Sequence, residues 1–567
     1  MNTKKNAIRL LAEICRQKGI RKVVFSPGSR SAPMVFAFSQ IPEIECLVIP
    51  DERVAGYFAL GLAQQLKQTV AVVCTSGTAA LNLGPAVCEA FYQHVPLLLL
   101  TADRPEGAVN KGENQAIWQD DIFADHIVLN DTIDGDASSE EELAQFAYDV
   151  NEAIDEIAND FPGPVHLNVR LSEPLYEFND EAFEHHLIFE KSQLESDYIS
   201  LKDLQRIKKT FSRYARKLII VGRREPDKNF RNLLKKLNAR TDVVVIHETL
   251  SNVHLENTIG NIDASLAAMK KEEEERFIPD VVITLGHQII SKKLKQFLQN
   301  KPKVHWDVPP DSNMERGFAL FGNMIDSFEP INENQFLETL LHTPDSTENN
   351  FKTNWLALSH QASQLSEKYF AQIPFSDLQA IKTLVETFPA KANIQYGNST
   401  PVRYGSFFEH KKSSRVHANR GTSGIDGCLS TAAGAAYTNK EITVCVLGDV
   451  SFFYDSNALW NNYLSPQLRI ILINNAGGTI FRLIDGPGKV QDFEKFFETK
   501  HNLSAKHLAS MYDLPYYFCA LQNELEETLK TFYEPSATAK ILEIKTDGAV
   551  SAEVYRQYFE YLRNDKQ

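Results

Sequence analysis

Short apolar runs alternate with helix-like stretches along most of the chain. In the first part of the sequence each apolar run ends in small or polar residues, and stretches such as 53–66 lie between the runs. These runs are residues 22–29, 44–52, 69–77 and 95–105. Continuous apolar strands that alternate with helices are typical of a parallel sheet covered on both faces. The pattern therefore predicts an α/β protein built from doubly wound parallel sheets.

The same alternation returns in two later units that follow polar stretches. Residues 189–200 and 342–355 are poor in apolar side chains, and we interpret both as linkers. This predicts three α/β domains, residues 1–182, 196–342 and 362–567. Ligands of open parallel sheets bind beyond the carboxyl ends of the strands, so site residues are expected there.

Composition narrows the class of protein. The chain of 567 residues has a formal net charge of −15, which argues against non-specific binding to nucleic acid or acidic lipid. No apolar run approaches the ~18–20 residues of a membrane span, and the N-terminal stretch is amphipathic rather than a signal peptide. Seven scattered cysteines without a CxxC pair argue against a disulfide framework or a zinc site. They favour a reducing, cytoplasmic location.

An aspartate and an asparagine follow two apolar runs of the third unit. Asp449 ends the run 442–448, and Asn475 comes 26 residues later, after the run 468–473. One βα crossover of this length brings both side chains to the carboxyl ends of neighbouring strands. Carboxylate and carboxamide oxygens there suit Mg²⁺ carrying a phosphate group, and the glycines at 477–478 let the backbone approach. Either residue alone would fit a helix N-cap or a turn; the joint spacing favours the metal site.

This GD…NN arrangement resembles the cofactor-binding fingerprint of thiamine diphosphate enzymes. Val450 stands where the superfamily usually has glycine, and in this it is similar to one branch, the menaquinone-pathway synthases called MenD. Seven further segments resemble that branch: SPGSRSAP, DERVAGYFALGLA, TSGTAALNLGPAV, LTADRPE, NQAIWQ, GPVHLNVRLSEPLY and NRGTSGIDGCLSTAAG. The resemblance implies three domains of the thiamine diphosphate enzyme type. It also implies thiamine diphosphate with Mg²⁺, or alternatively Mn²⁺, and a homodimer or homotetramer.

The resemblance also implies which residues hold the cofactor. By pattern alone, Asp51 and Glu52 fit an acid at a helix start equally well; the family pattern assigns Glu52 to the pyrimidine nitrogen and leaves Asp51 as the cap. Asp449, Asn475 and the Gly477 carbonyl would bind the metal ion. Ile425 would wedge beneath the cofactor, although by itself it reads as a core residue. The remaining implied cofactor contacts are Ser423, Gly424, Gly448, Ser451, Ile480 and Phe481, and ordinary core packing is the alternative for the last two.

Four arginines lie beside small residues at predicted strand ends. They are Arg30, Arg104, Arg403 and Arg420. Guanidinium groups bind carboxylates bidentately and stay charged, so four of them in a net-acidic chain suggest a polyanionic substrate. Simple solvation is the alternative for each one, and SPGSR could instead be a phosphate-binding turn, although it lacks the lysine of a P-loop.

The resemblance implies a reaction for these groups. It is decarboxylation of 2-oxoglutarate, followed by conjugate addition of the resulting succinyl carbanion equivalent to isochorismate. Glu52 and Gln115 would lie at the reacting centre. The implied substrate contacts are Ser399 and Arg420 for the donor, and Ser29, Arg30, Arg104, Arg403 and Lys292 for the acceptor. The family often has Lys-Arg where this chain has two lysines, so the role of Lys293 stays open.

Three other functions fit parts of the sequence. The nearest is another thiamine diphosphate-dependent 2-oxo acid decarboxylase or synthase. A nicotinamide-dependent oxidoreductase would share the strand–helix alternation, but no GxGxxG follows a first strand. A non-catalytic ligand-binding protein would not need Glu52, Asp449 and Asn475 together.

Overall fold

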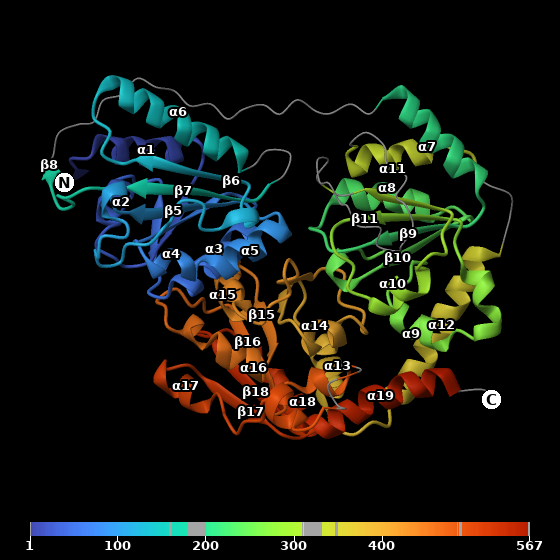
Figure 1. Ribbon diagram of the computed structural model, residues 1–567. Coiled ribbons are helices and arrows are strands. Elements are labelled where there is room, and N and C mark those ends of the chain that lie inside the picture. Colours follow the sequence, from blue (N-terminus) through green and yellow to red (C-terminus); the bar gives the residue numbers. More distant parts are fainter. Residues whose placement is uncertain are drawn as a thin grey trace.

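Three parallel sheets, each flanked by helices, build the protein (Figure 1). The computed structural model describes residues 2–157, 162–179, 200–308, 310, 331–345, 350–484, 486 and 490–564. The predicted α/β class is therefore confirmed. The predicted domain limits at 1, 182, 196 and 567, and almost all of the first predicted linker, lie outside the described residues. No helix within the described ranges is long and apolar enough to cross a membrane.

The first sheet has six parallel strands in the order β3-β2-β4-β5-β7-β6. Its strands are β2 (Lys22–Phe25), β3 (Glu45–Val48), β4 (Val70–Cys74), β5 (Leu97–Asp103), β6 (Leu129–Asp134) and β7 (Pro164–Arg170). Its helices are α1 (Asn6–Gln17), α2 (Ala32–Ser39), α3 (Glu52–Leu66), α4 (Thr78–Asn82), α5 (Gly84–Gln93) and α6 (Glu140–Glu156). Every residue of β4 and β5 is buried, which is why these strands appear in the sequence as unbroken apolar runs.

The third sheet repeats this topology in the order β14-β13-β15-β16-β18-β17. Its strands are β13 (Asn393–Tyr396), β14 (Arg415–Ala418), β15 (Thr443–Gly448), β16 (Leu468–Asn474), β17 (Tyr516–Cys519) and β18 (Lys540–Lys545). Its helices are α13 (Asp377–Thr387), α14 (Thr400–Gly405), α15 (Cys428–Thr438), α16 (Asp449–Tyr454), α17 (Lys506–Met511), α18 (Gln522–Phe532) and α19 (Gly548–Asn564). In both sheets the strand order reverses beside the first strand, and such a switch point opens a crevice for ligands.

The middle sheet is smaller, with four parallel strands in the order β10-β9-β11-β12. These are β9 (Lys217–Val221), β10 (Val243–His247), β11 (Val281–Leu285) and β12 (Val304–Val308). The helices are α7 (Leu201–Arg213), α8 (Lys228–Asn238), α9 (Ile262–Ala268), α10 (Lys292–Leu298) and α11 (Glu333–Leu341). A short antiparallel pair, β1 (Asn2–Thr3) and β8 (Phe178–Asn179), lies at the edge of the first domain.

The second predicted linker differs from the structure. Helix α12 (Phe351–Phe370) starts inside the stretch interpreted as a linker and packs on the middle domain. Trp355 is fully buried there, and its indole N–H donates to the Phe277 carbonyl at 3.2 Å. The apolar anchors Phe351, Trp355 and Leu358 recur at helical spacing, with polar residues between them. A helix with a narrow apolar face was therefore mistaken for a polar linker.

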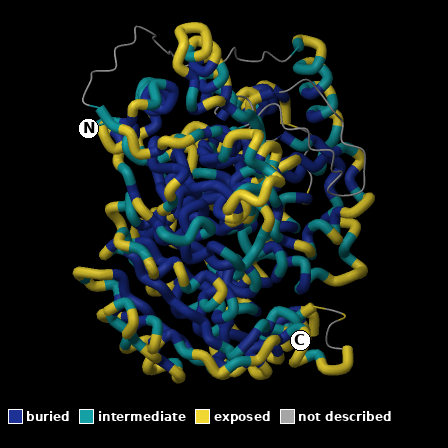
Figure 2. Tube along the Cα trace, turned by 60° about the vertical axis from the view of Figure 1, so that its left-hand side comes forward, coloured by how far each residue is buried: buried dark blue, intermediate teal, exposed yellow. Residues whose placement is uncertain are grey.

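Helices α3 and α15 join the first and third domains at very close range. A Cβ placed on Gly61 of α3 would lie 2.0 Å from the Thr431 carbonyl oxygen, and one on Gly434 of α15 would lie 2.0 Å from the Phe58 carbonyl oxygen. Figure 2 shows buried residues, in dark blue, through the interior of the molecule, and one apolar core cluster includes residues of both helices, among them Phe58 and Leu429. The first and third domains of one chain are therefore packed through the backbones of these two helices, with no room for a side chain at either glycine.

Replacing Gly61 by alanine is expected to destabilise the fold by about 1–3 kcal/mol or more, because the added methyl forces α3 and α15 apart. The measurement is the midpoint of urea unfolding followed by circular dichroism. Gly84→Ala is the matched control, since a Cβ there meets no atom within 4 Å. Equal midpoints for Gly61→Ala and Gly84→Ala would contradict the close-contact explanation.

Candidate active site

Most predicted site residues follow the carboxyl ends of strands in the first and third sheets. Ser29 and Arg30 follow β2, Glu52 follows β3, Arg104 follows β5, Ser399 follows β13, Arg420 follows β14, Asp449 follows β15 and Asn475 follows β16. This is the edge at which open parallel sheets bind ligands. The two six-stranded sheets therefore each present one set of candidate groups.

The structure brings Asp449, Asn475 and Gly477 together. Asp449 is 2% exposed and starts α16. Its Oδ1 accepts from the Val450 N–H at 2.7 Å, and its Oδ2 accepts from the Gly477 N–H at 2.9 Å. The turn that follows β16 is thereby folded onto the aspartate at the end of β15. This is the arrangement that the spacing in the sequence predicts.

The carboxamide of Asn475 is oriented by a residue that sequence reasoning missed. Asn475 Nδ2 donates to Asp377 Oδ2 at 2.7 Å, whereas its Oδ1 is buried and accepts no hydrogen bond. Asp377 is fully buried and also accepts from Thr546 Oγ1 at 2.5 Å and Ser551 Oγ at 3.0 Å. Burial raises the pKa of Asp377 to about 6. Because buried polar atoms normally have partners, the bare Asn475 oxygen marks a position for a bound group.

These oxygens fit a hard divalent cation. The Gly477 carbonyl accepts one hydrogen bond, from the Thr479 N–H at 3.0 Å, and keeps a second lone pair. A carboxylate, a carboxamide and a carbonyl oxygen are ligands that Mg²⁺ takes together with phosphate oxygens. In the described part of the chain, no group of three or more His, Cys, Asp or Glu side chains could hold a metal ion. A second residue that the sequence did not suggest, His501, lies with Nε2 3.3 Å from Asp449 Oδ2.

The loop 419–427 carries the predicted wedge and packs beside this cluster. Asn398 Nδ2 donates to the Asn419 carbonyl at 2.5 Å and to the Gly424 carbonyl at 2.6 Å. Ser451 Oγ donates to the Ile425 carbonyl at 2.7 Å. The half-buried Ile425 is therefore fixed between the end of β13 and the start of α16.

The turn after β16 supplies the other predicted contacts of the third domain. Ile480 and Phe481 lie in the short 3₁₀ helix Thr479–Arg482, and both are half-buried. Ser423 adopts a left-handed backbone conformation with φ 65°, which is uncommon for residues other than glycine. A Cβ on Gly448 would meet no atom within 4 Å, so space is open beside the start of α16. These positions are compatible with an apolar wall next to the predicted metal ligands.

Two predicted arginines of the third domain lie close together without an acidic partner. Arg420 Nη1 donates to Asn398 Oδ1 at 3.2 Å, and its buried Nε has no partner. Arg403 is exposed and donates from Nη1 to the Ser399 carbonyl at 2.6 Å. Burial, and then the nearby charge of Arg403, lower the pKa of Arg420. Neither forms an ion pair within the described residues, so the pair suits an anionic ligand.

The predicted arginines of the first domain are paired with acids at the surface. Arg30 Nη2 lies 3.1 Å from Glu173 Oε1, and Arg104 Nη1 lies 3.6 Å from Glu113 Oε2. The side chains of Glu173 and Glu113 are 67% and 53% exposed, so both ion pairs are weak. Ser29 Oγ lies 3.0 Å from the Tyr176 hydroxyl. A substrate carboxylate could displace these surface acids at little cost.

Gln115 lies on an exposed loop that a buried glutamine supports. Gln115 has a left-handed backbone with φ 54°, and its Cα lies 3.1 Å from the position of a Cβ on Gly77. Gln119, which is 1% exposed, accepts from the Gly77 N–H at 2.7 Å and donates to Asn168 Oδ1 at 2.9 Å. The sequence motif NQAIWQ contains both residues, but only burial separates the supporting glutamine from the exposed one.

The two acids at the start of α3 have different surroundings. Asp51 Oδ1 accepts from the Val54 N–H at 3.2 Å, so the predicted helix cap is confirmed. Glu52 is half-buried, and its Oε2 lies 3.5 Å from Asn82 Nδ2. Within the described residues Glu52 makes no hydrogen bond to the third domain. Its carboxylate is therefore available to a ligand or to another chain.

The basic segment of the middle domain begins helix α10. Lys292 is exposed, and the Lys293 ammonium lies 3.9 Å from the centroid of the Phe559 ring. Lys295, which sequence reasoning missed, lies one turn after Ser291, whose N–H donates to Glu248 at 2.7 Å. Burial lowers the pKa of Lys295, Glu248 opposes that shift, and the charge of Arg420 adds to it. Among the lysines of this helix, Lys295 is the one whose pKa the charge of Arg420 lowers.

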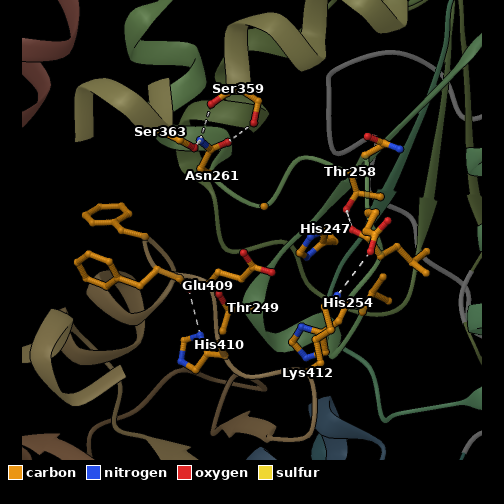
Figure 3. A pocket seen from close by; sticks show the side chains of 17 residues that line it. His247, Thr249, His254, Thr258, Asn261, Ser359, Ser363, Glu409, His410 and Lys412 are labelled. Atoms are coloured by element: carbon orange, nitrogen blue, oxygen red, sulfur yellow. Dashed lines mark hydrogen bonds and ion pairs between the residues drawn. The ribbon is translucent and has the colours of Figure 1, made fainter. Parts of the chain in front are cut away.

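A separate cavity of about 540 Å³ lies between the middle domain, α12 and the segment 407–412 (Figure 3). Its lining includes His247, His254 and His410, and burial lowers the pKa of His247 and of His410 to about 4. These two imidazoles are therefore neutral at pH 7. None of the predicted site residues lines this cavity.

Comparison with known proteins identifies the family of the chain. The family model described as "Thiamine pyrophosphate enzyme, N-terminal TPP binding domain" matches residues 5–124, and "Middle domain of thiamine pyrophosphate" matches residues 190–394. A relative from Flavobacterium psychrophilum is 38% identical over 97% of this chain and 98% of its own length. Relatives from Christiangramia forsetii and Bacteroides fragilis are 37% and 34% identical, over 98% and 99% of both chains. All three are named 2-succinyl-5-enolpyruvyl-6-hydroxy-3-cyclohexene-1-carboxylate synthase. The chain belongs to this synthase family.

Membership of the synthase family confirms the resemblance found in the sequence. The chain is a thiamine diphosphate-dependent transferase with the domains of that enzyme superfamily. The nicotinamide-dependent oxidoreductase is thereby excluded, and so is a non-catalytic binding protein. The roles of individual site residues remain predictions, which the geometry above supports to different degrees.

Proposed function

We propose that the chain joins the succinyl unit of 2-oxoglutarate, after decarboxylation, to isochorismate, giving 2-succinyl-5-enolpyruvyl-6-hydroxy-3-cyclohexene-1-carboxylate in menaquinone biosynthesis. The observation that carries this proposal is the similarity, over nearly the whole chain, to synthases named for that product. The free state of all seven cysteines supports a cytoplasmic location.

The third domain would hold the diphosphate end of the cofactor. Asp449, the bare Oδ1 of Asn475 and the Gly477 carbonyl would bind Mg²⁺, with Mn²⁺ as the alternative, and the metal ion would bind the diphosphate. Ser423, Gly424 and Ile425 would contact the cofactor from the clamped loop. When bound, thiamine diphosphate supplies the carbon that attacks a keto group and stabilises the charge left by decarboxylation.

Glu52 would hold and move a proton at the pyrimidine nitrogen of the cofactor. We propose that the cofactor lies between Glu52 of one copy and Asp449 of a second copy, in a homodimer or a tetramer built from it. The Arg53 guanidinium donates to the Tyr454 carbonyl at 2.9 Å, which places Tyr454 next to Arg53, the residue that follows Glu52 in the chain. Tyr454, Trp460 and Leu81 are 55%, 53% and 52% exposed. Large apolar side chains with this much exposure support the proposal of a partner surface.

The cations would bind and orient two polyanionic substrates. Ser399 and Arg420 would hold the carboxylates of 2-oxoglutarate. The groups proposed for isochorismate are Ser29, Arg30, Arg104, Lys292 and Arg403. Gln115 would lie near the reacting carbon, and Ile480 with Phe481 would exclude water from it. Bidentate guanidinium contacts fix the orientation of a carboxylate as well as its affinity.

Lys295→Gln is expected to raise the KM for one of the two substrates on the order of tenfold, because it removes a half-buried positive charge whose pKa the charge of Arg420 lowers. Steady-state kinetics with each substrate varied in turn would measure this. Lys292→Gln should have a smaller effect, since Lys292 is exposed. If the two variants changed both KM values equally, Lys295 would have no special place in the site.

Product analysis tests the proposed function. The enzyme is incubated with thiamine diphosphate, Mg²⁺ and isochorismate, and with either 2-oxoglutarate or pyruvate as the donor. Mass spectrometry is expected to find the succinylated ring acid from 2-oxoglutarate and no adduct from pyruvate. An adduct from pyruvate, or consumption of 2-oxoglutarate without an adduct, would point to the alternative thiamine diphosphate-dependent decarboxylase or synthase.

A further inference from the structure

Glu89 of the first domain binds the loop that carries Arg420 in the third domain. It lies on α5 and is 1% exposed. Its Oε1 accepts from the Gly421 N–H at 2.7 Å, and its Oε2 accepts from both the N–H and the hydroxyl of Thr422 at 2.7 Å. Gln93 Nε2 donates to Oε1 at 2.5 Å. Each oxygen of the buried carboxylate therefore accepts two hydrogen bonds, and none of these four donors is a basic side chain.

The contact requires the local sequence. A Cβ on Gly421 would lie 2.6 Å from the Glu89 carbonyl oxygen, so only glycine lets the loop approach α5 this closely. Other contacts hold the two ends of the loop, through Asn398 at Asn419 and Gly424 and through Ser451 at Ile425. The middle of the loop, residues 421–422, is held by Glu89.

The position of Arg420 depends on this middle segment. Arg420 directly precedes Gly421, and the one hydrogen bond of its guanidinium in the described structure goes to Asn398 Oδ1. Without the contact at 421–422, the backbone beside Arg420 would be free to turn while the loop ends stayed in place. A misplacement of about 1 Å of a substrate-binding group can cost on the order of 100-fold in rate.

We propose that Glu89 is a positioning residue of the active site: from the first domain it fixes the loop 420–425, and so sets where Arg420 meets the donor carboxylate. The assignment of the donor to Arg420 rests on the proposed function. Glu89 also places one negative charge near Arg420 in a buried setting, which helps to keep the guanidinium charged. The carboxylate thus supports Arg420 both through the backbone and through charge.

Glu89→Gln tests the proposal. The carboxamide has the shape of the carboxylate, but one of its two oxygens is replaced by an NH₂ group, which cannot accept the two hydrogen bonds made at that position. Glu333→Gln is the matched control. Glu333 is a 4% exposed glutamate of the middle domain that accepts from the Gly286 N–H at 2.6 Å and from Arg224 at 2.9 Å. Three quantities are measured in the full-length enzyme: the KM and kcat with 2-oxoglutarate, the affinity for thiamine diphosphate by calorimetry with Mg²⁺, and hydrogen exchange of residues 419–427.

We expect Glu89→Gln to speed exchange at residues 421–422 and to raise the KM for 2-oxoglutarate at least on the order of tenfold, with kcat changed less. The affinity for thiamine diphosphate should fall by a smaller factor, because Ser451 still holds Ile425. Glu333→Gln should lower the melting temperature without changing KM or exchange in the loop. If Glu89→Gln matched this control in all three readouts, Glu89 would be a packing residue and the proposal would be overturned. If the wild type ignored 2-oxoglutarate while Glu89→Gln still loosened the loop, the proposed donor would be wrong and the positioning contact would stand.

Discussion

Glu52→Gln is expected to lower turnover on the order of 10²–10⁴-fold, the usual contribution of a positioned proton-transfer group. Glutamine keeps the size of the side chain and a hydrogen-bonding oxygen, but it cannot exchange a proton with the pyrimidine nitrogen. Stability should be unchanged, because Glu52 is half-buried and bonds only weakly to Asn82 at 3.5 Å. Single-turnover rates with saturating cofactor and both substrates would give the result.

The neighbouring aspartate provides the control for this prediction. Asp51 caps α3 through the Val54 N–H, so Asp51→Ala should cost about 0.5–2 kcal/mol of stability and leave most of the turnover. The two adjacent acids would then show opposite behaviour, one in catalysis and one in folding. Near wild-type turnover in Glu52→Gln, or a greater loss in Asp51→Ala, would show that the roles are assigned to the wrong residues.

Asn475→Ala is expected to weaken binding of thiamine diphosphate in the presence of Mg²⁺ by at least about 100-fold, the upper end of what outer-shell changes cause at metal sites. The variant removes the one carboxamide oxygen that is buried and bare beside Asp449. It also leaves Asp377 without the amide donor at 2.7 Å. Calorimetric titration of the apoprotein with thiamine diphosphate, at fixed Mg²⁺, measures the effect without any turnover.

A buried asparagine outside the site serves as the control that distinguishes a loss of cofactor affinity from a general loss of stability. Asn252 Oδ1 accepts from the Val416 N–H at 2.8 Å, and its Nδ2 donates to the Val416 carbonyl at 3.1 Å, so both ends have partners. Asn252→Ala should lower stability and leave the affinity for the cofactor close to that of the wild type. If Asn475→Ala bound thiamine diphosphate as tightly as Asn252→Ala, the metal ligands would have to be sought elsewhere.

The fold was predictable because its signals are local. Buried parallel strands appear as unbroken apolar runs, and polar residues directly after them identify the ligand-binding edge. Asp449 and Asn475 could be paired from spacing alone, since one crossover connects β15 with β16. The start of helix α12 was missed for the opposite reason: inside the supposed linker it contributes only Phe351 and Trp355 as apolar residues, and the ring partners of Trp355, Phe277 and Phe297, lie far away in the sequence.

The residues that support the site could not be predicted in this way. Asp377 meets Asn475 across 98 residues, and Glu89 meets Gly421 across 332. No motif links such positions, and a buried acid in a helix is not distinguishable in the sequence from an exposed one. The lysines of α10 could not be told apart in the sequence either. Their different surroundings depend on how the helix packs, and Lys293, for example, lies over the Phe559 ring.

Release of carbon dioxide from 2-oxoglutarate labelled at the carboxyl group next to the keto carbon tests the central claim most directly. The assay contains thiamine diphosphate and Mg²⁺ and is run with and without isochorismate. We predict that sustained release requires isochorismate and is lost in Glu52→Gln. Release at the full rate without isochorismate would contradict the account, since it would make the protein a decarboxylase with no need of an acceptor site.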